Sequence, residues 1–217
     1  DVFVTKLDSY GNYLWTHQPG GPGINSGYAL TLDSAGSVYI AGAFSGTADF
    51  DPGSGTDYLT SAGDRDIFAW KLDNGGNQVW SRRAGSSTGL DLAYGIALSG
   101  SGDVLLTGFF EGTAGFGSST NLISSGGRDA FVWKLDLTGS SVWARAMGGG
   151  FNDEARGIAT DASGNAYTTG RFYGTADFDP GTQSVTRSSR DCMGITSDDI
   201  FVSKMDAGGN FVWVQQA

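Results

Sequence analysis

The chain has 217 residues, a formal net charge of −10 and 17% charged residues. This acidic balance argues against a nucleic-acid partner, because phosphate binding needs clustered Lys and Arg side chains. No apolar run approaches the ~18 residues that a membrane-spanning helix needs. The 36 glycines and the lack of a long 3.6-residue periodicity predict short strands and tight turns, with little helix.

The first predicted element is a β-hairpin over residues 1–15, which read "DVFVTKLDSYGNYLW". Closely similar segments start at Asp66, Asp129 and Asp199, at intervals of 65, 63 and 70 residues. In each segment, two runs rich in apolar residues flank an Asp-x-x-Gly turn, and the second run ends in Trp. This pattern is typical of two antiparallel strands joined by a tight turn, and its regular spacing indicates a repeat architecture.

A second kind of hairpin is predicted between these copies. It starts near Gly27, Gly95 and Gly157, where two apolar runs again flank a polar turn that contains Gly. We name the strands of this hairpin A and B, and those of the fifteen-residue hairpin C and D. One full period therefore contains four antiparallel strands in the order A, B, C, D.

Four-stranded antiparallel units at a regular period predict an all-β fold, a β-propeller built of four-stranded blades. The predicted blades cover residues 27–82, 94–145 and 157–214, and residues 1–15 supply half of another, which gives about 3.5 blades in a single domain. Closed propellers need ~4–8 blades. We therefore expect the remaining blades to come from the same longer polypeptide or from further copies of the chain. We favour a longer polypeptide, in which the missing A–B hairpin precedes Asp1.

Two segments carry a family resemblance: "DIFVSKMDAGGNFVW" from Asp199 and "GIATDASGNAYTTGRFYGTADFDPG" from Gly157. They resemble the SBBP-type β-propeller repeat of bacterial secreted and cell-surface proteins, over nearly the whole chain from Asp1 to Val214. The resemblance implies a propeller fold and a secreted or cell-surface location, and it implies no particular catalytic residue. The middle copy departs from the pattern, with "TAGFG" in place of "TADFDPG".

The connections between strands predict where a ligand would bind. The A–B and C–D turns are short and uniform, whereas the B–C connections span 22, 19 and 27 positions. Binding residues favour variable loops on a rigid scaffold, so we expect a protein or glycan partner on the face that carries the B–C and D–A connections. The candidate ligand-binding residues are Arg187, Arg190 and Asp191 in the longest connection, with Asp153 and Glu154 in a D–A loop. The alternative is a surface insertion without a role.

A calcium site is the one cofactor that the sequence suggests. The "ADFDPG" segments place Asp49 with Asp51, and Asp177 with Asp179. Alternate carboxylates and a turn carbonyl suit Ca²⁺, which takes ~6–8 oxygen ligands. The alternative is a plain Asp-Pro-Gly turn. The middle repeat has Gly at the matching positions, which leaves both interpretations open.

The sequence predicts no catalytic residue. His17 is the only histidine, and no Gly-x-Ser-x-Gly motif lies near it. The leading hypothesis is a non-enzymatic extracellular propeller that serves as a structural or protein-interaction module. Two alternatives stay open: a glycan-binding, lectin-like propeller, and an enzyme such as a hydrolase or lyase with its active site in the central channel. The enzyme hypothesis needs acidic residues that converge on the propeller axis. The candidates Asp33 and Asp161 fall in A–B turns instead.

Overall fold

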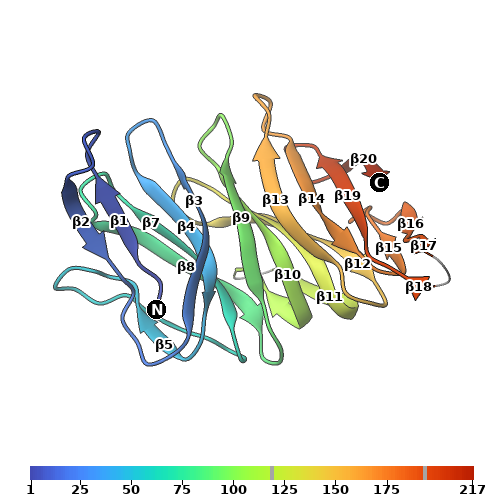
Figure 1. The fold of residues 1–217 in the computed structure, drawn as a ribbon, viewed down its shortest axis with the longest axis horizontal. Coiled ribbons are helices and arrows are strands. Elements are labelled where there is room, and N and C mark those ends of the chain that lie inside the picture. Colours follow the sequence, from blue (N-terminus) through green and yellow to red (C-terminus); the bar gives the residue numbers. More distant parts are fainter. Residues whose placement is uncertain (118–119, 193–194) are drawn as a thin grey trace.

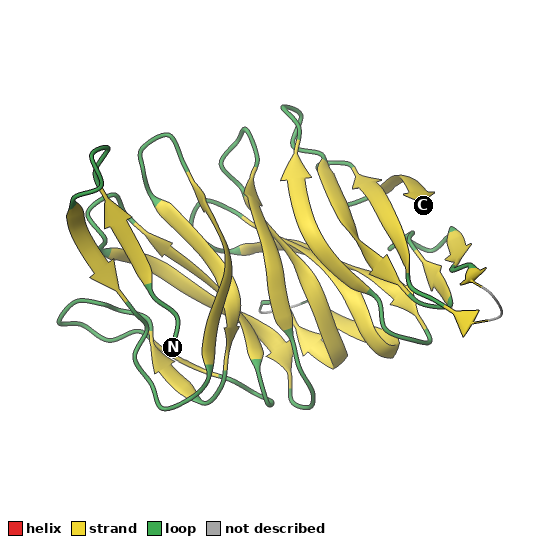
Figure 2. Ribbon diagram, in the orientation of Figure 1, coloured by secondary structure: helices red, strands yellow, loops and turns green. Residues whose placement is uncertain are grey.

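The computed structural model describes residues 1–117, 120–192 and 195–217, with the side chains of residues 191–196 left out of the description. Every regular element in these ranges is a β-strand, and the strands that pair within sheets do so antiparallel, so the all-β prediction is confirmed (Figure 2). The described residues include no helix long and apolar enough to cross a membrane.

The main strands form one hairpin and three four-stranded units. The N-terminal hairpin consists of β1 (Val4–Leu7) and β2 (Tyr13–His17). Unit 1 consists of β3 (Asn25–Leu32), β4 (Val38–Phe44), β7 (Asp66–Leu72) and β8 (Gln78–Ser86). Unit 2 consists of β9 (Leu92–Leu98), β10 (Val104–Gly115), β11 (Asn121–Leu135) and β12 (Ser141–Gly149). Unit 3 consists of β13 (Glu154–Thr160), β14 (Ala166–Phe172), β19 (Asp199–Met205) and β20 (Phe211–Gln216).

In every unit each strand pairs with the next main strand, and the B and C strands share one register. Val38 to Phe44 pair with Leu72 to Asp66, and the corresponding strands of units 2 and 3 pair in the same way. The turns follow the Asp-x-x-Gly pattern for a local reason. In the A–B turn of unit 3, Gly164 adopts a φ of +78°, while Asp161 Oδ1 accepts the backbone N–H groups of Ser163 and Asn165. The Asn165 side chain also donates to this carboxylate and is the main reason that the pKa of Asp161 falls to about 2.

The units follow one another in chain order along the long axis of the molecule (Figure 1). Their A strands lie side by side, β9 packing between β3 and β13. Apolar clusters fill the space between successive sheets: Val2 and Val4 pack with unit 1, Tyr39 and Trp80 with unit 2, and Val132 with unit 3. Because β4 and β10 are covered on both faces, all residues from Val38 to Phe44 and from Val104 to Phe110 are buried.

Short strands in the B–C connections tie each unit to the preceding part of the chain. Asp49 forms a backbone bridge with Gly20, Gly115 pairs with Gly85, and Asp177 pairs with Gly148. The residue after each of these positions is a buried Phe that packs on the Phe residues of its own B and C strands: Phe50, Phe116 and Phe178. In units 1 and 3 the segment is a small hairpin: β5 (Thr47–Asp49) with β6 (Tyr58–Thr60), and β15 (Thr175–Asp177) with β16 (Thr186–Ser188). A further pair, β17 (Asp191–Cys192) with β18 (Ile195–Thr196), lies in the longest connection.

The two ends of this row of sheets are uncovered. The N- and C-termini lie at opposite ends of the molecule (Figure 1). At the N-terminal end, Phe3 is 68% exposed, whereas its equivalent Phe68 is fully buried. At the C-terminal end, Ile200 is 58% exposed, whereas its equivalent Ile67 is fully buried. The end sheets thus carry the same apolar side chains as the inner sheets, without a neighbour to cover them.

Candidate functional site

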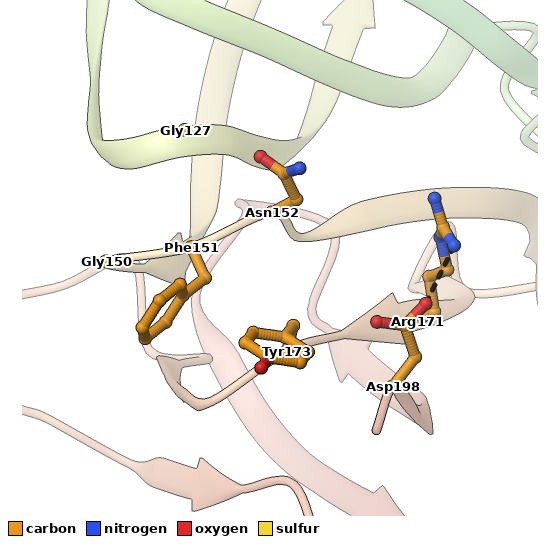
Figure 3. Close-up of a pocket in the computed structure, with 7 residues that line it drawn as sticks. All are labelled: Gly127, Gly150, Phe151, Asn152, Arg171, Tyr173 and Asp198. Carbon is orange, nitrogen blue, oxygen red and sulfur yellow. Dashed lines mark hydrogen bonds and ion pairs between the residues drawn. The ribbon is translucent and has the colours of Figure 1, made fainter. Parts of the chain in front are cut away.

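A cleft of about 430 Å³ lies at the junction of units 2 and 3, where B strands end and A strands begin (Figure 3). It therefore lies among the B–C and D–A connections, the face on which the sequence places a ligand. Its lining residues are Gly127 of β11, Gly150, Phe151 and Asn152 of the β12–β13 loop, Arg171 of β14, and Tyr173 and Asp198 of the β14–β19 connection.

Two aromatic rings form one wall of the cleft. The rings of Phe151 and Tyr173 meet edge to face, with centroids 5.0 Å apart and an interplanar angle of 77°. Phe151 is held against the backbone of Gly174, where an added Cβ would lie 2.6 Å from a carbon of the Phe151 ring. Gly174 has a φ of +72°, so this close approach requires glycine at that position. Phe151 is nevertheless 54% exposed and presents apolar surface to the cleft.

An ion pair forms the opposite wall (Figure 3). Arg171 Nη1 lies 2.7 Å from Asp198 Oδ2, and Arg171 Nη2 lies 3.2 Å from Glu154 Oε2. Hydrogen bonds from Arg171 to Glu154, together with the charges of Glu154 and Asp198, hold the pKa of Arg171 above its ordinary value. The guanidinium group is therefore fixed in place, and its positive charge is already matched by carboxylates.

Glu154 is the centre of the charged network beneath the cleft. Its side chain is fully buried, and it forms ion pairs with Arg128 at 2.8 Å, with Arg171 and with Arg156. Burial alone would raise the pKa of Glu154, but hydrogen bonds from Arg128 and Arg171 outweigh it and hold the pKa below the ordinary value. Arg128 also lies 3.1 Å from Glu111, and both belong to unit 2, so the pair between Arg128 and Glu154 joins units 2 and 3. Glu154 thus stays ionised at neutral pH and holds the arginines beneath the cleft in place through its ion pairs.

Asp153 points away from this network, as expected for consecutive residues at the start of a strand. It is 1% exposed, and its oxygens accept the backbone N–H groups of Gly149 at 2.7 Å and Tyr173 at 3.1 Å. Burial raises the pKa of Asp153 to about 6. Asp91 of unit 2 occupies the equivalent position, accepts the equivalent N–H groups and also has a pKa of about 6 because of burial. Asp153 therefore fixes the D–A loop, and its side chain does not line the cleft.

A related pair of buried aspartates, Asp66 and Asp129, stands at the first position of the repeated fifteen-residue segments. Asp66 Oδ2 lies 2.6 Å from Arg83 Nη1 and also accepts a backbone N–H. Asp129 is 2% exposed and has Ala146 at the position of Arg83. Its Oδ2 accepts the N–H of Ser125 at 3.0 Å, and its Oδ1 has no partner in the described part of the chain. Burial raises the pKa of Asp129 to about 7.

The other candidate binding residues lie away from the cleft. Arg187 belongs to β16, and its guanidinium donates to the backbone carbonyl of Val214 in β20 at 3.2 Å. The backbone N–H of Arg190 donates to Asp199 Oδ2. The side chain of Asp191 lies outside the described residues. The structure therefore brings Asp153 and Glu154 beneath the cleft and leaves the two arginines outside it.

The four aspartates proposed for calcium cap local turns. Oδ1 of Asp49 accepts the backbone N–H groups of Asp51 and Asp57, and Oδ1 of Asp177 does the same for Asp179 and Val185. Asp51 and Asp179 each accept one backbone N–H from the glycine two residues later. In the described part of the chain, no three His, Cys, Asp or Glu side chains are close enough together to hold a metal ion. Calcium binding stays a prediction.

Sequence reasoning missed most of the residues that line the cleft. Phe151 is an aromatic residue within the glycine-rich segment "GGGFNDE", and that contrast was the one signal for it. Tyr173, Arg171 and Asp198 are brought to Phe151 only by the packing of unit 3 on unit 2.

No protein-family model matches the chain, and no curated protein matches it. The resemblance to SBBP-type repeats thus stays a prediction that depends on the repeated segments themselves.

Proposed function

We propose that the chain is an arc of a larger β-propeller and serves as a non-enzymatic structural or protein-interaction module of a secreted or cell-surface bacterial protein. The observation that carries the proposal is the pair of uncovered ends. Each end sheet exposes apolar residues whose equivalents are buried between inner sheets, and burying such a side chain contributes roughly 1.5–3 kcal/mol. Sheets that stack through these faces gain stability from a further sheet at either end.

The N-terminal end has an open strand edge and an open apolar face that one further hairpin would cover. In the described residues β1 pairs with β2 alone, so it lacks the B strand that covers the equivalent edge of β7. The A strand of unit 1 is uncovered as well, because Leu30 is 59% exposed whereas its equivalent Ile96 is 9% exposed. An A–B hairpin in front of the first C–D hairpin would pair with β1 and cover Leu30. The equivalent register would place a B-strand Phe opposite Asp1 and a Val opposite Leu7.

The experiment adds this hairpin from the chain's own sequence. A second copy of residues 25–65 is fused in front of Asp1, so that Arg65 precedes Asp1 as it precedes Asp66. We expect the fusion to stay monomeric, to melt several degrees higher than the original chain and to bind less of the dye ANS. The gain reflects burial of Leu30 in the new interface and packing of Phe3 on the added copies of Phe44 and Phe50, as Phe68 packs in unit 1. It is offset in part by the ordering of the added residues.

Two variants of the added copy control for non-specific effects. The face of β4 that meets the next unit carries Tyr39 and Ala41, whereas Ile40 points to the preceding side. Ala41→Asp in the added copy places a charge in the new interface and abolishes the gain. Ile40→Thr in the added copy changes a residue on the outer face of the new hairpin, so this variant retains most of the gain in melting temperature. Equal melting temperatures for the fusion and its Ala41→Asp variant would refute the proposal.

A second candidate function, glycan binding, is favoured by one observation: the exposed aromatic pair in the cleft, opposite fixed polar groups. This function does not compete with the first, because a propeller segment can carry a binding cleft on its loop face.

A further inference from the structure

The cleft at the junction of units 2 and 3 has a lining that the repeated scaffold does not require. Tyr173 and Arg171 of unit 3 occupy the positions of Glu111 and Phe109 in unit 2, and unit 2 folds with the same strand pairing. At the unit 1–2 junction, the loop equivalent to the one with Phe151 reads "STGL" and contains no aromatic residue. The aromatic pair and the Arg171–Asp198 pair are thus particular to this junction.

The charges around the cleft exclude a strongly ionic ligand. Among the described residues that line the cleft, the one cation is Arg171, which is held between Glu154 and Asp198. An anion would have to compete with these carboxylates, and a cation would meet the guanidinium group. A neutral ligand with hydroxyl groups avoids both costs, because a hydroxyl can donate to Asp198 and accept from Arg171.

The remaining walls complete a site for such a ligand. Phe151 and Tyr173 offer apolar ring surface on one side, and Asn152 lies across the same space (Figure 3). Asn152 Oδ1 accepts the backbone N–H of Arg128 at 3.1 Å, which leaves the amide Nδ2 oriented as a donor to the cleft. A volume of about 430 Å³ falls within the ~300–1,000 Å³ typical of small-molecule sites, which combine apolar walls with a few placed polar groups.

We propose that this cleft binds a neutral pyranose sugar, stacked through its C–H face on Phe151 and Tyr173 and held through vicinal hydroxyls by Asp198, Arg171 and Asn152. The proposal deepens the glycan-binding candidate and is independent of how the row of sheets is completed.

The test is saturation-transfer-difference NMR on the intact chain with methyl glycosides of glucose, galactose and mannose, and with methyl glucuronide as a charged probe. We expect millimolar binding of at least one neutral glycoside, with signal transfer to the sugar ring protons. Phe151→Ala and Asn152→Ala each weaken it at least tenfold. Tyr10→Ala, which removes an aromatic residue that is 89% exposed in a C–D turn, leaves it unchanged.

Three results would overturn the proposal: no binding of any neutral glycoside, binding of the glucuronide alone, or a neutral-glycoside affinity that Phe151→Ala leaves unchanged. Thermal melts of both cleft variants confirm that they fold, which both side chains permit because they are exposed. Since the fusion experiment measures stability and this one measures sugar binding, failure of one is distinguishable from failure of the other.

Discussion

Asp129 gives the sharpest prediction about stability, because it is a buried carboxylate that lacks the arginine of its counterpart. Burial raises its pKa to about 7, from an ordinary value of 3.8. Between these two pH values the folded chain holds a proton that the unfolded chain has released, so the free energy of unfolding falls as the pH rises. Each pKa unit corresponds to about 1.4 kcal/mol, which gives a loss on the order of 4 kcal/mol by pH 8.

The perturbation is Asp129→Asn, which keeps the shape of the side chain and removes its charge. Urea unfolding at pH 5 and pH 8 measures the effect. At pH 5 the variant should be more stable by only about 1.6 kcal/mol, because pH 5 lies little more than one unit above the ordinary pKa at which the unfolded chain releases the proton. At pH 8 the variant should be more stable by several kcal/mol.

A second variant supplies the missing partner. Ala146 lies opposite Phe131 in the same register that places Arg83 opposite Phe68, so Ala146→Arg brings a guanidinium group to Asp129. We expect it to stabilise the chain more at pH 8 than at pH 5, because more of the stability linked to the Asp129 proton has been lost at pH 8. A difference between Asp129→Asn and the original chain that is the same at both pH values would refute this reasoning.

Three further predictions concern the network, the turns and the sheet contacts. Glu154→Gln leaves partly exposed arginines uncompensated and should lower the free energy of unfolding by about 2 kcal/mol in urea, whereas Glu111→Gln should cost less than ~1 kcal/mol. If the "ADFDPG" carboxylates bind calcium, EDTA lowers the Tm and Asp179→Ala abolishes that effect; an unchanged Tm would mean that they only cap turns. Trp143→Phe removes a hydrogen bond across the unit 2–3 junction and should cost about 1 kcal/mol by urea unfolding, and Trp213→Phe, at the uncovered end, should cost less.

The strands were predictable because each repeated segment carries its own local signals. Each segment of fifteen residues contains alternating apolar residues, β-branched side chains and an Asp-x-x-Gly turn. The hairpin of residues 1–15 and its copies could therefore be predicted without tertiary information. The short strands β5 and β15 were missed, because three residues carry no periodicity. Their buried neighbours Phe50 and Phe178 sit in segments that look like polar turns from sequence alone.

The cleft was less predictable than the strands, for a physical reason. Asp153 and Glu154 were found because paired acids in a loop stand out by residue type. The positions of Phe151 and Arg171 relative to each other depend on how unit 3 packs on unit 2, which no local pattern encodes. Arg187 was selected for its charge, and its place in β16 directs it to the backbone of β20.

We expect β1 and the uncovered end of unit 1 to accept one more hairpin of the chain's own kind. Hydrogen–deuterium exchange of residues 1–7 tests it most directly, measured in the original chain and in the fusion with residues 25–65. Amides of β1 should exchange rapidly in the original chain and become as protected as those of β7 in the fusion. Unchanged exchange of β1 in a folded, monomeric fusion would contradict it.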